Sequence, residues 1–400
     1  MKTYKETVST IEGKRRFTNL PGVEISKMMS AAVGNPQDSL KFVHIAGTNG
    51  KGSTAAFLCE IALRSGIKVG MFTSPHLVTF RERIRIGHDL ISEEDVVRLG
   101  NMLLDMDFGE NIHPTMFDYC FVMAMLYFKE QNVELVILET GLGGRLDSTN
   151  IIEVPCVSVI THIGYDHTAI LGDTLDKIAA EKCGILKRGS CLVTCEQSEE
   201  AMKVIAKSAS ELGMDCVVAK PWEKALGMHG TYQKTNAGVA AEAARVLAGK
   251  GFDISEKNIE EGIANAFWPG RMQVISKDPL VIIDGAHNPD GVEALRDTIE
   301  NEYGGRKFDF IMGVMADKDY ISMLKIIKPY IRHLTTVSVD YGRAESASVL
   351  AEECKKLSIP ADASEKTIKT IMGEIKEDTI VFGSLYFVGD IMNNLRLSCL

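Results

Sequence analysis

The first residue of this sequence whose surroundings predict chemistry is Lys51, which lies in a glycine-rich stretch. The stretch is His44-Ile-Ala-Gly-Thr-Asn-Gly-Lys-Gly-Ser-Thr54, between an apolar run over residues 40–46 and a helical pattern over residues 55–64. A glycine-rich turn at a helix N-terminus offers backbone N–H groups to an anion, and a lysine there can reach the outer phosphates of a nucleotide. We therefore expect this loop to bind phosphate. Its binding residues would be Gly47, Thr48, Asn49, Gly50, Lys51, Gly52 and Ser53.

The loop departs from the common pattern G-x-x-x-x-G-K-[ST], because Ile45 replaces the first glycine and Gly52 separates Lys51 from Ser53. The hydroxyl that would bind Mg²⁺ directly after the lysine is missing, so another group must serve the metal. Mg²⁺ prefers oxygen ligands, and Glu139 at the end of the apolar run 135–138 is a candidate, unless it is a solvated carboxylate at a strand end. Ser74 could supply the hydroxyl, although the local sequence supports a turn residue before a proline at least as well.

Two further polar residues have no definite role on local grounds alone. His167 follows Asp166 in a predicted loop, and an imidazole is more often structural or a ligand of Zn²⁺ or Mn²⁺ than of Mg²⁺. Lys182 would by default be a surface lysine.

Short apolar runs near residues 40–46, 69–73, 135–138 and 156–160 predict strands, and helical patterns lie between them. This alternation predicts a mostly parallel sheet with helices on both faces. Ligands of such sheets bind beyond the carboxyl ends of the strands, where the loops after residues 46, 73, 138 and 160 carry the candidate residues. Residues 81–86 alternate charged and apolar side chains and predict an exposed ribbon or loop.

A break near Phe267-Trp-Pro-Gly-Arg-Met272 separates this region from a second series of apolar runs. These runs cover residues 280–283, 308–314, 334–339 and 379–382. We therefore expect an α/β protein with an N-terminal P-loop ATPase-like domain over residues 1–268. A smaller Rossmann-like α/β domain would follow over residues 269–400.

The composition is that of an ordinary globular enzyme of 400 residues, with 45% hydrophobic and 24% charged residues. A net charge of -10 argues against a general nucleic-acid binder or a partner of anionic membranes. The nine cysteines are scattered without a C-x-x-C pair, and we find no signal peptide or transmembrane run. These features predict a cytoplasmic protein with reduced thiols.

Taken together, the motifs resemble the folylpolyglutamate and dihydrofolate synthases of the Mur ligase superfamily over nearly the whole chain. The resemblance rests on residues 44–54, Thr73-Ser-Pro-His-Leu77, residues 139–150, Asp166-His-Thr168, Glu181-Lys-Cys-Gly184, and residues 268–271, 284–289 and 383–386. It implies a ligase that uses ATP to add L-glutamate to the γ-carboxylate of a (tetrahydro)folate through an acyl phosphate. Alternatives are a dihydrofolate synthase acting on dihydropteroate, a bifunctional enzyme, a muropeptide ligase, or a nucleotide-driven switch that makes no bond.

The resemblance also implies roles for individual residues. Ser74 and Glu139 would hold one Mg²⁺, while His167 and an N-carboxylated Lys182 would serve a second. The nucleotide contacts would be Asn236, Arg271, Asp284 and His287, and the catalytic set would be Lys51, His167, Lys182 and His287. The N-terminal domain would also bind the folate: Thr115, Phe117 and Asp147 would line the pterin pocket, and Arg83 would lie in a segment that covers the folate. We expect a monomer. The chain departs from the family pattern at Met116 and Asp118, which replace an aromatic residue and a glutamate, and at Cys183, which replaces an alanine.

Overall fold

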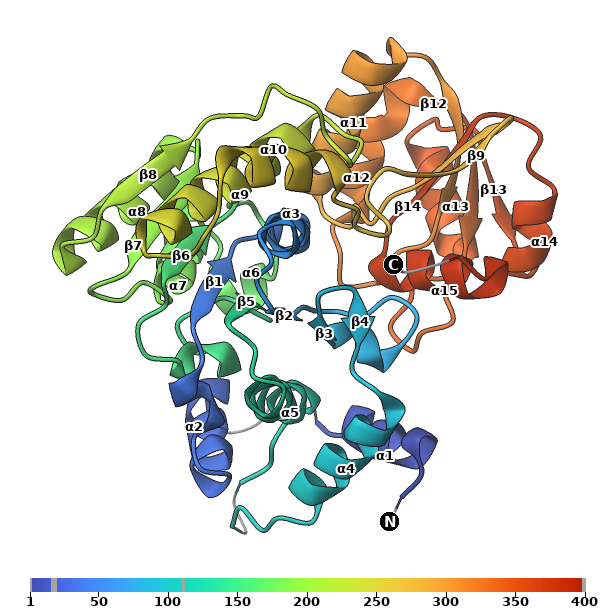
Figure 1. Cartoon of the computed structure of the whole chain (residues 1–400). Helices are drawn as coiled ribbons and strands as arrows, with labels where there is room; N and C mark the ends of the chain where they lie inside the picture. Colours follow the sequence, from blue (N-terminus) through green and yellow to red (C-terminus); the bar gives the residue numbers. More distant parts are fainter. Residues whose placement is uncertain (1, 16–19, 110–111, 398–400) are drawn as a thin grey trace. The chain divides into compact units, whose positions relative to one another are not determined.

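The computed structural model describes residues 2–15, 20–109 and 112–397, which divide into two compact units (Figure 1). The first unit comprises Met1–Ala225 and Thr235–Ala266, and the second comprises Leu226–Lys234 and Phe267–Leu400. The short segment Leu226–Lys234 therefore packs with the second unit although it precedes part of the first in the chain.

An eight-stranded sheet forms the centre of the first unit, in the order β4-β3-β2-β5-β1-β6-β7-β8. Its strands are β1 (Phe42–Ala46), β2 (Val69–Phe72), β3 (Ile84–Ile86), β4 (Asp89–Leu90), β5 (Leu135–Glu139), β6 (Val157–Ile160), β7 (Cys191–Cys195) and β8 (Cys216–Ala219). The strands from β2 to β8 in this order pair in parallel, and at the other edge β3 pairs antiparallel with both β2 and β4. Because helices cover both faces of a parallel sheet, its central strands are fully buried, and this explains the continuous apolar runs.

The helices of the first unit connect these strands and flank the sheet (Figure 1). They are α1 (Tyr4–Glu12), α2 (Gly22–Ala32), α3 (Lys51–Arg64), α4 (Glu93–Leu104), α5 (Met116–Glu130), α6 (Thr168–Leu171), α7 (Leu175–Cys183), α8 (Glu199–Leu212), α10 (Glu256–Asn265) and most of α9 (Tyr232–Gly249). Helical 3₁₀ turns are η1 (Pro36–Ser39), η2 (Phe80–Arg83) and η3 (Ser148–Ile151).

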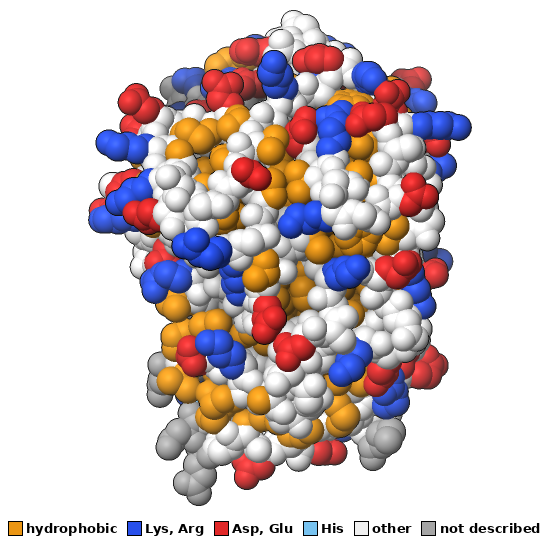
Figure 2. Space-filling model, turned by 60° about the vertical axis from the view of Figure 1, so that its left-hand side comes forward, with side chains coloured by type: hydrophobic (Ala, Val, Ile, Leu, Met, Phe, Trp, Pro, Cys, Tyr) orange, Lys and Arg blue, Asp and Glu red, His pale blue; other side chains and the backbone are white. Residues whose placement is uncertain are grey.

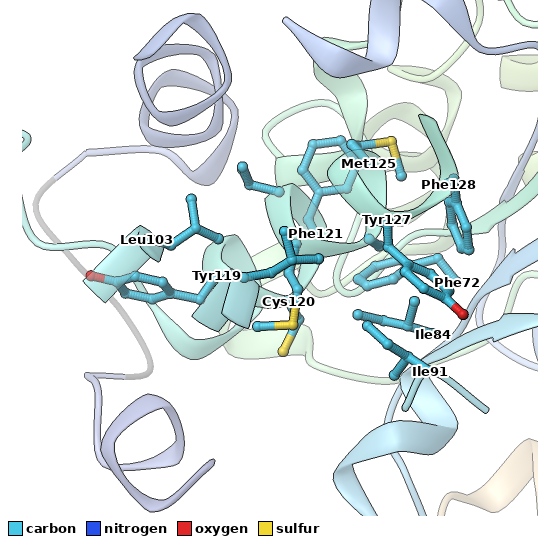
Figure 3. Packing of buried hydrophobic residues seen from close by; sticks show 14 of the residues in the cluster. Phe72, Ile84, Ile91, Leu103, Tyr119, Cys120, Phe121, Met125, Tyr127 and Phe128 are labelled. Carbon is cyan, nitrogen blue, oxygen red and sulfur yellow. The ribbon is translucent and has the colours of Figure 1, made fainter. Parts of the chain in front are cut away.

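Helix α5 lies inside a large apolar cluster of this unit, which includes side chains from β2, β3 and α4 (Figure 3). The ring of Phe121 meets that of Phe72 edge-on at 6.0 Å between centroids, and Phe128 is also fully buried. A helix that is apolar on nearly all sides is stable only when it is enclosed in this way. The packing fixes the N-terminus of α5, where two of the predicted site residues, Thr115 and Phe117, lie.

The segment over residues 81–86 corrects one prediction, because it is buried rather than exposed. Arg83 is 5% and Arg85 6% exposed, and Ile84 is fully buried. Their guanidinium groups bind inside the protein: Arg83 Nε donates to His76 Nδ1 over 2.9 Å, and Arg85 Nη2 lies 3.7 Å from the sulfur of Met71. Alternating charged and apolar residues indicate an exposed segment only where the charged groups reach water. Here both arginines have partners inside the protein instead.

The second unit contains a six-stranded sheet in the order β13-β12-β11-β14-β10-β9. Its strands are β9 (Gln273–Lys277), β10 (Leu280–Ile283), β11 (Phe308–Met312), β12 (Ile331–Val337), β13 (Ala361–Ser364) and β14 (Thr379–Phe382). All pair in parallel except the edge strand β9. The helices are α11 (Pro289–Tyr303), α12 (Tyr320–Ile327), α13 (Ala347–Lys356), α14 (Ile368–Gly373) and α15 (Leu385–Leu395), with the turn η4 (Lys328–Tyr330). The predicted α/β class, with a mostly parallel N-terminal sheet and a second C-terminal sheet, is confirmed.

Apolar side chains on the face seen in Figure 2 lie in small areas between lysine, arginine, aspartate and glutamate side chains. Among the described residues, none of the helices combines the length and the apolar character needed to cross a bilayer.

Candidate active site

The phosphate loop connects the end of β1 to the start of α3 and has the tight geometry that its glycines allow. Gly50 has φ 89° and is the N-cap of α3, where the absence of a side chain leaves the first-turn N–H groups uncapped. A Cβ on Gly47 would lie 1.8 Å from Thr161 Oγ1, so only glycine fits there. Thr48 N–H donates to His162 O over 2.8 Å, which ties the loop to the segment after β6. This arrangement is suited to an anion of the size of a phosphate.

Lys51 is the first residue of α3, and its ammonium group bends back over the loop. Its Nζ donates to Gly47 O over 3.1 Å and to Thr48 O over 3.2 Å, and it lies 4.0 Å from Glu139 Oε1. The lysine that is expected to bind phosphate and the carboxylate that is expected to bind the metal therefore lie next to each other.

Ser74 follows β2 and Glu139 is the last residue of the neighbouring strand β5, and the structure brings the two residues together. Ser74 N–H donates to Glu139 Oε2 over 3.0 Å. The Glu139 side chain is only 5% exposed, so it is not a solvated carboxylate at a strand end. Within the described ranges, His, Cys, Asp and Glu side chains do not form any cluster of three that could hold a metal. Mg²⁺ bound to nucleotide needs only one or two protein carboxylates, and the Glu139 carboxylate beside the loop is of the type that such an ion would require.

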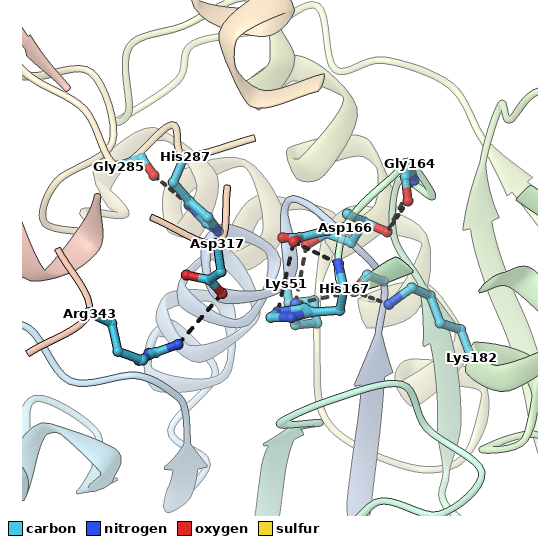
Figure 4. A network of polar contacts seen from close by, with 11 residues as sticks. Lys51, Gly164, Asp166, His167, Lys182, Gly285, His287, Asp317 and Arg343 are labelled. Carbon is cyan, nitrogen blue, oxygen red and sulfur yellow. Dashed lines mark hydrogen bonds and ion pairs between the residues drawn. The ribbon is translucent and has the colours of Figure 1, made fainter. Parts of the chain in front are cut away.

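Lys182 lies on the other side of the phosphate loop and corrects the local interpretation as a surface lysine. It is 4% exposed, and its Nζ donates to Gly47 O over 2.8 Å (Figure 4). Burial, with the charge of Lys51 as the second cause, lowers the pKa of Lys182 to about 7. Figure 4 shows Asp166 and His167 converging on the same place, and His167 has φ 51° with its N–H donating to Asp166 Oδ1 over 2.8 Å. With a pKa of about 7, about half of the Lys182 amine is neutral near pH 7, unlike an ordinary lysine.

The residues assigned to the pterin pocket gather around the loop after β5. A Cβ on Gly141 would lie 2.7 Å from the ring of Phe117, and Gly141 N–H donates to Asp147 Oδ2 over 3.0 Å. Thr115 caps α5, and its hydroxyl donates to Asp118 Oδ2 over 2.7 Å. Asp147 therefore stabilises the loop by accepting backbone hydrogen bonds, and it is also a candidate residue for binding the acceptor.

The fourth residue of this set, Arg83, is held by His76, a residue for which no role is predicted from the sequence. His76 accepts from Arg83 Nε at Nδ1, and its Nε2 lies 3.7 Å from Glu12 Oε1 in α1. Burial, followed by the charge of Arg83, lowers the pKa of His76 to about 3, so this imidazole is neutral. The position of His76 in the Thr-Ser-Pro-His motif is the one feature of the sequence that could have indicated this role.

The predicted nucleotide residues Arg271, Asp284 and His287 come together within the second unit, near the end of β10. Arg271 Nη1 lies 2.1 Å from the place of a Cβ on Gly285, and His287 Nδ1 lies 2.8 Å from Gly285 O (Figure 4). Asp284 accepts from Met272 N and Ala286 N, both over 2.8 Å. Burial raises the pKa of Asp284, and the nearby Arg271 opposes that rise.

Tyr232 adds a contact to Asp284, and Asn236 is the remaining residue predicted to contact the nucleotide. Tyr232 OH donates to Asp284 Oδ2 over 3.1 Å, a contact that is not predicted from the sequence, although Tyr232 lies four residues before Asn236. Asn236 belongs to the first unit, where its Oδ1 lies 2.2 Å from the place of a Cβ on Gly50. Asn236 therefore lies directly against the phosphate loop.

Comparisons with known proteins give the family of this chain. Residues 45–220 match the Mur ligase middle domain, and residues 270–384 match the Mur ligase glutamate ligase domain. The chain is 36% identical to the dihydrofolate synthase/folylpolyglutamate synthase of Bacillus subtilis (strain 168), over 98% of this chain and 99% of the relative. It resembles the crystal structure of folylpolyglutamate synthase from Thermotoga maritima with a TM-score of 0.84 and 33% identity, over 98% of this chain and 97% of the other.

A further solved structure is similar and holds ligands. E. coli FolC in complex with DHPP and ADP has a TM-score of 0.85 and 28% identity, over 99% of this chain and 98% of the other. The identity to the Bacillus subtilis relative extends over essentially the full length of both proteins. The chain belongs to the dihydrofolate synthase/folylpolyglutamate synthase family of the Mur ligases, and it is an ATP-dependent acid–amino-acid ligase.

Proposed function

We propose that this protein adds L-glutamate to the γ-carboxylate of a reduced folate, with ATP converted to ADP and phosphate. The observation that carries the proposal is the meeting of Lys51, Glu139 and Lys182 around one glycine-rich loop, in a chain of this family. The loop supplies phosphate-binding N–H groups and a lysine ammonium, and Glu139 supplies an oxygen for a divalent ion.

The reaction requires activation of the acceptor because a carboxylate is a poor electrophile at neutral pH. We propose that its oxygen attacks the γ-phosphorus of ATP, which forms an acyl phosphate and releases ADP. The amine of glutamate then attacks the acyl carbon, an amide forms, and phosphate leaves. Phosphoryl transfer depends on positioning and on neutralisation of charge, and the Lys51 ammonium and the loop amides supply both.

Glu139 and Ser74 would hold one Mg²⁺, and His167 and Lys182 would serve a second. Bound Mg²⁺ neutralises phosphate charge and orients the transferred group. A lysine ammonium cannot ligate a cation, but a carbamate on Nζ offers anionic oxygens. The neutral amine adds to CO₂ with loss of one proton, and the pKa of Lys182 near 7 supports carboxylation at this residue.

The acceptor pocket would be formed by Thr115, Phe117 and Asp147, with Arg83 in the segment that covers the folate. Dihydropteroate is a second candidate acceptor, because the Bacillus subtilis relative carries both activities in its name. Asn236, Arg271, Asp284 and His287 would contact the nucleotide. We further expect a cytoplasmic protein. We also expect a monomer, and light scattering on the purified protein tests this oligomeric state.

The test is release of ADP in the presence of ATP, Mg²⁺, L-glutamate and one acceptor at a time. We expect release with tetrahydrofolate that depends on glutamate, and the comparison with dihydropteroate decides whether the enzyme is bifunctional. Release with a nucleotide-sugar muropeptide alone would support a different Mur ligase. Hydrolysis that does not respond to glutamate with any acceptor would contradict the proposed function.

A further inference from the structure

His44 is a fully buried imidazole in the middle of β1, a strand whose other side chains are apolar. Its Nε2 lies 2.9 Å from Thr149 Oγ1, and Thr149 Oγ1 lies 2.6 Å from Asp147 Oδ1. Thr149 is also fully buried, so the chain of contacts is shielded from water. A buried polar group in a strand lowers the stability of the fold unless it is hydrogen-bonded. The partner of His44, Thr149, lies more than one hundred residues further along the chain.

The directions of these hydrogen bonds follow from the number of protons available. The Asp147 carboxylate accepts, so the single hydroxyl proton of Thr149 is donated to it. The same hydroxyl must then accept from His44, which places the proton of the neutral imidazole on Nε2. Among the described residues His44 Nδ1 has no hydrogen-bond partner, in agreement with an unprotonated nitrogen in an apolar surrounding. Burial lowers the pKa of His44 to about 3, so the imidazole stays neutral at ordinary pH.

Asp147 transmits this restraint to the loop after β5. Its Oδ1 also accepts from Thr149 N over 3.0 Å, while Oδ2 accepts from Gly141 N over 3.0 Å and Leu142 N over 2.8 Å. The ring of Phe117 packs directly against Gly141. The orientation of one carboxylate therefore sets the position of two backbone amides and of the surface on which Phe117 lies.

We propose that His44 is a positioning residue for the acceptor pocket: through the Thr149 hydroxyl it holds the Asp147 carboxylate and the 141–142 amides in place. The inference rests on the proposed function for the identity of the pocket. It also implies that β1 supports both substrates, since the same strand runs from His44 into the phosphate loop at Gly47.

The test uses four variants that separate hydrogen bonding from volume. His44→Leu and Thr149→Val remove the polar contacts but fill nearly the same space. His44→Gln can present an amide N–H near the place of Nε2, and Thr149→Ser keeps the hydroxyl. The matched control is Ser158→Ala: Ser158 pairs with His44 in the neighbouring strand and is fully buried, and its hydroxyl lies 3.2 Å from Ser190 Oγ.

Loss of a buried hydrogen bond with one partner left unsatisfied predicts a rise of about ten-fold in the acceptor KM for His44→Leu and for Thr149→Val. The ATP KM should change less than about two-fold, and His44→Gln and Thr149→Ser should recover most of the acceptor affinity. The double variant should be no worse than either single variant, because both remove the same chain of contacts. An acceptor KM that rises no more than in Ser158→Ala would overturn the proposal.

Two measurements that need no activity keep this test separate from the proposed function. Nitrogen-15 spectra of histidine-labelled protein should show His44 protonated on Nε2, and a proton on Nδ1 would overturn the inference. Hydrogen exchange at the Gly141 and Leu142 amides should be faster in His44→Leu than in Ser158→Ala, and equal rates would also overturn it. Failure of the wild-type protein to use any folate acceptor would instead contradict the proposed function.

Discussion

Replacement of Gly50 by alanine tests the phosphate loop through two effects that the structure separates. The residue has φ 89°, and an alanine there costs about 1–2 kcal/mol in backbone strain. Its Cβ would also lie 2.2 Å from Asn236 Oδ1, which is closer than any real contact. The cheapest response is a rotation of the Asn236 side chain away from the loop, because that atom ends a short flexible group. We therefore expect the variant to fold but to lose the proposed contact of Asn236 with nucleotide.

Gly66→Ala is the matched control, because Gly66 has φ 73° and open space where its Cβ would be. Both variants should lose about 1–2 kcal/mol of unfolding free energy from strain, measured by urea denaturation. Only Gly50→Ala should weaken binding of a non-hydrolysable ATP analogue, by about ten-fold in Kd, which corresponds to about 1.4 kcal/mol. Calorimetry provides the measurement, and adding Asn236→Ala to Gly50→Ala should cause little further loss. Equal affinities of the Gly50→Ala and Gly66→Ala proteins would refute the reasoning.

Three other predictions concern charge and protons. Lys51→Ala, Glu139→Ala and Lys182→Ala should each lower glutamate-dependent ADP release by about 10²-fold or more, since each removes an electrostatic contact, and a near-normal rate would remove that residue from the mechanism. A chelator should stop turnover and excess Mg²⁺ should restore it; turnover that persists would contradict the metal sites. The pKa of His44 is about 3 when folded but near 6.5 when unfolded, so the unfolded chain takes up the proton first and stability falls as pH drops from 6.5 towards 3. Between pH 7 and pH 5 the loss of unfolding free energy should be about 2 kcal/mol smaller in His44→Gln than in the wild type, and equal losses would show that His44 is not the group responsible.

The sequence predicts the sheet edge that carries the site because buried parallel strands leave clear apolar runs. The loops after β2, β5, β1 and β6 hold the candidates, and these four strands are neighbours in the sheet. Lys51, Glu139 and Ser74 meet as expected from this order. Their assignment to ATP and metal ions stays a prediction.

Contacts between residues far apart in the chain could not be predicted from local pattern. Lys182 is buried with its Nζ bound to Gly47 O, and His76, which binds Arg83, lies against Glu12 of α1. The residues next to Lys182 and Arg83 in the sequence give no sign of these contacts. In the sequence both residues therefore look like ordinary surface residues. The same holds for the segment Leu226–Lys234, which packs with the second unit through contacts such as Tyr232 with Asp284.

The central claim is that the acceptor carboxylate attacks the γ-phosphorus of ATP, and oxygen labelling tests it most directly. The folate acceptor is prepared with ¹⁸O in its γ-carboxylate and converted with ATP and L-glutamate, and the released phosphate is examined by ³¹P spectroscopy. An acyl phosphate intermediate predicts that each phosphate carries one ¹⁸O from the acceptor. Phosphate without the label, released together with the glutamylated product, would contradict the account.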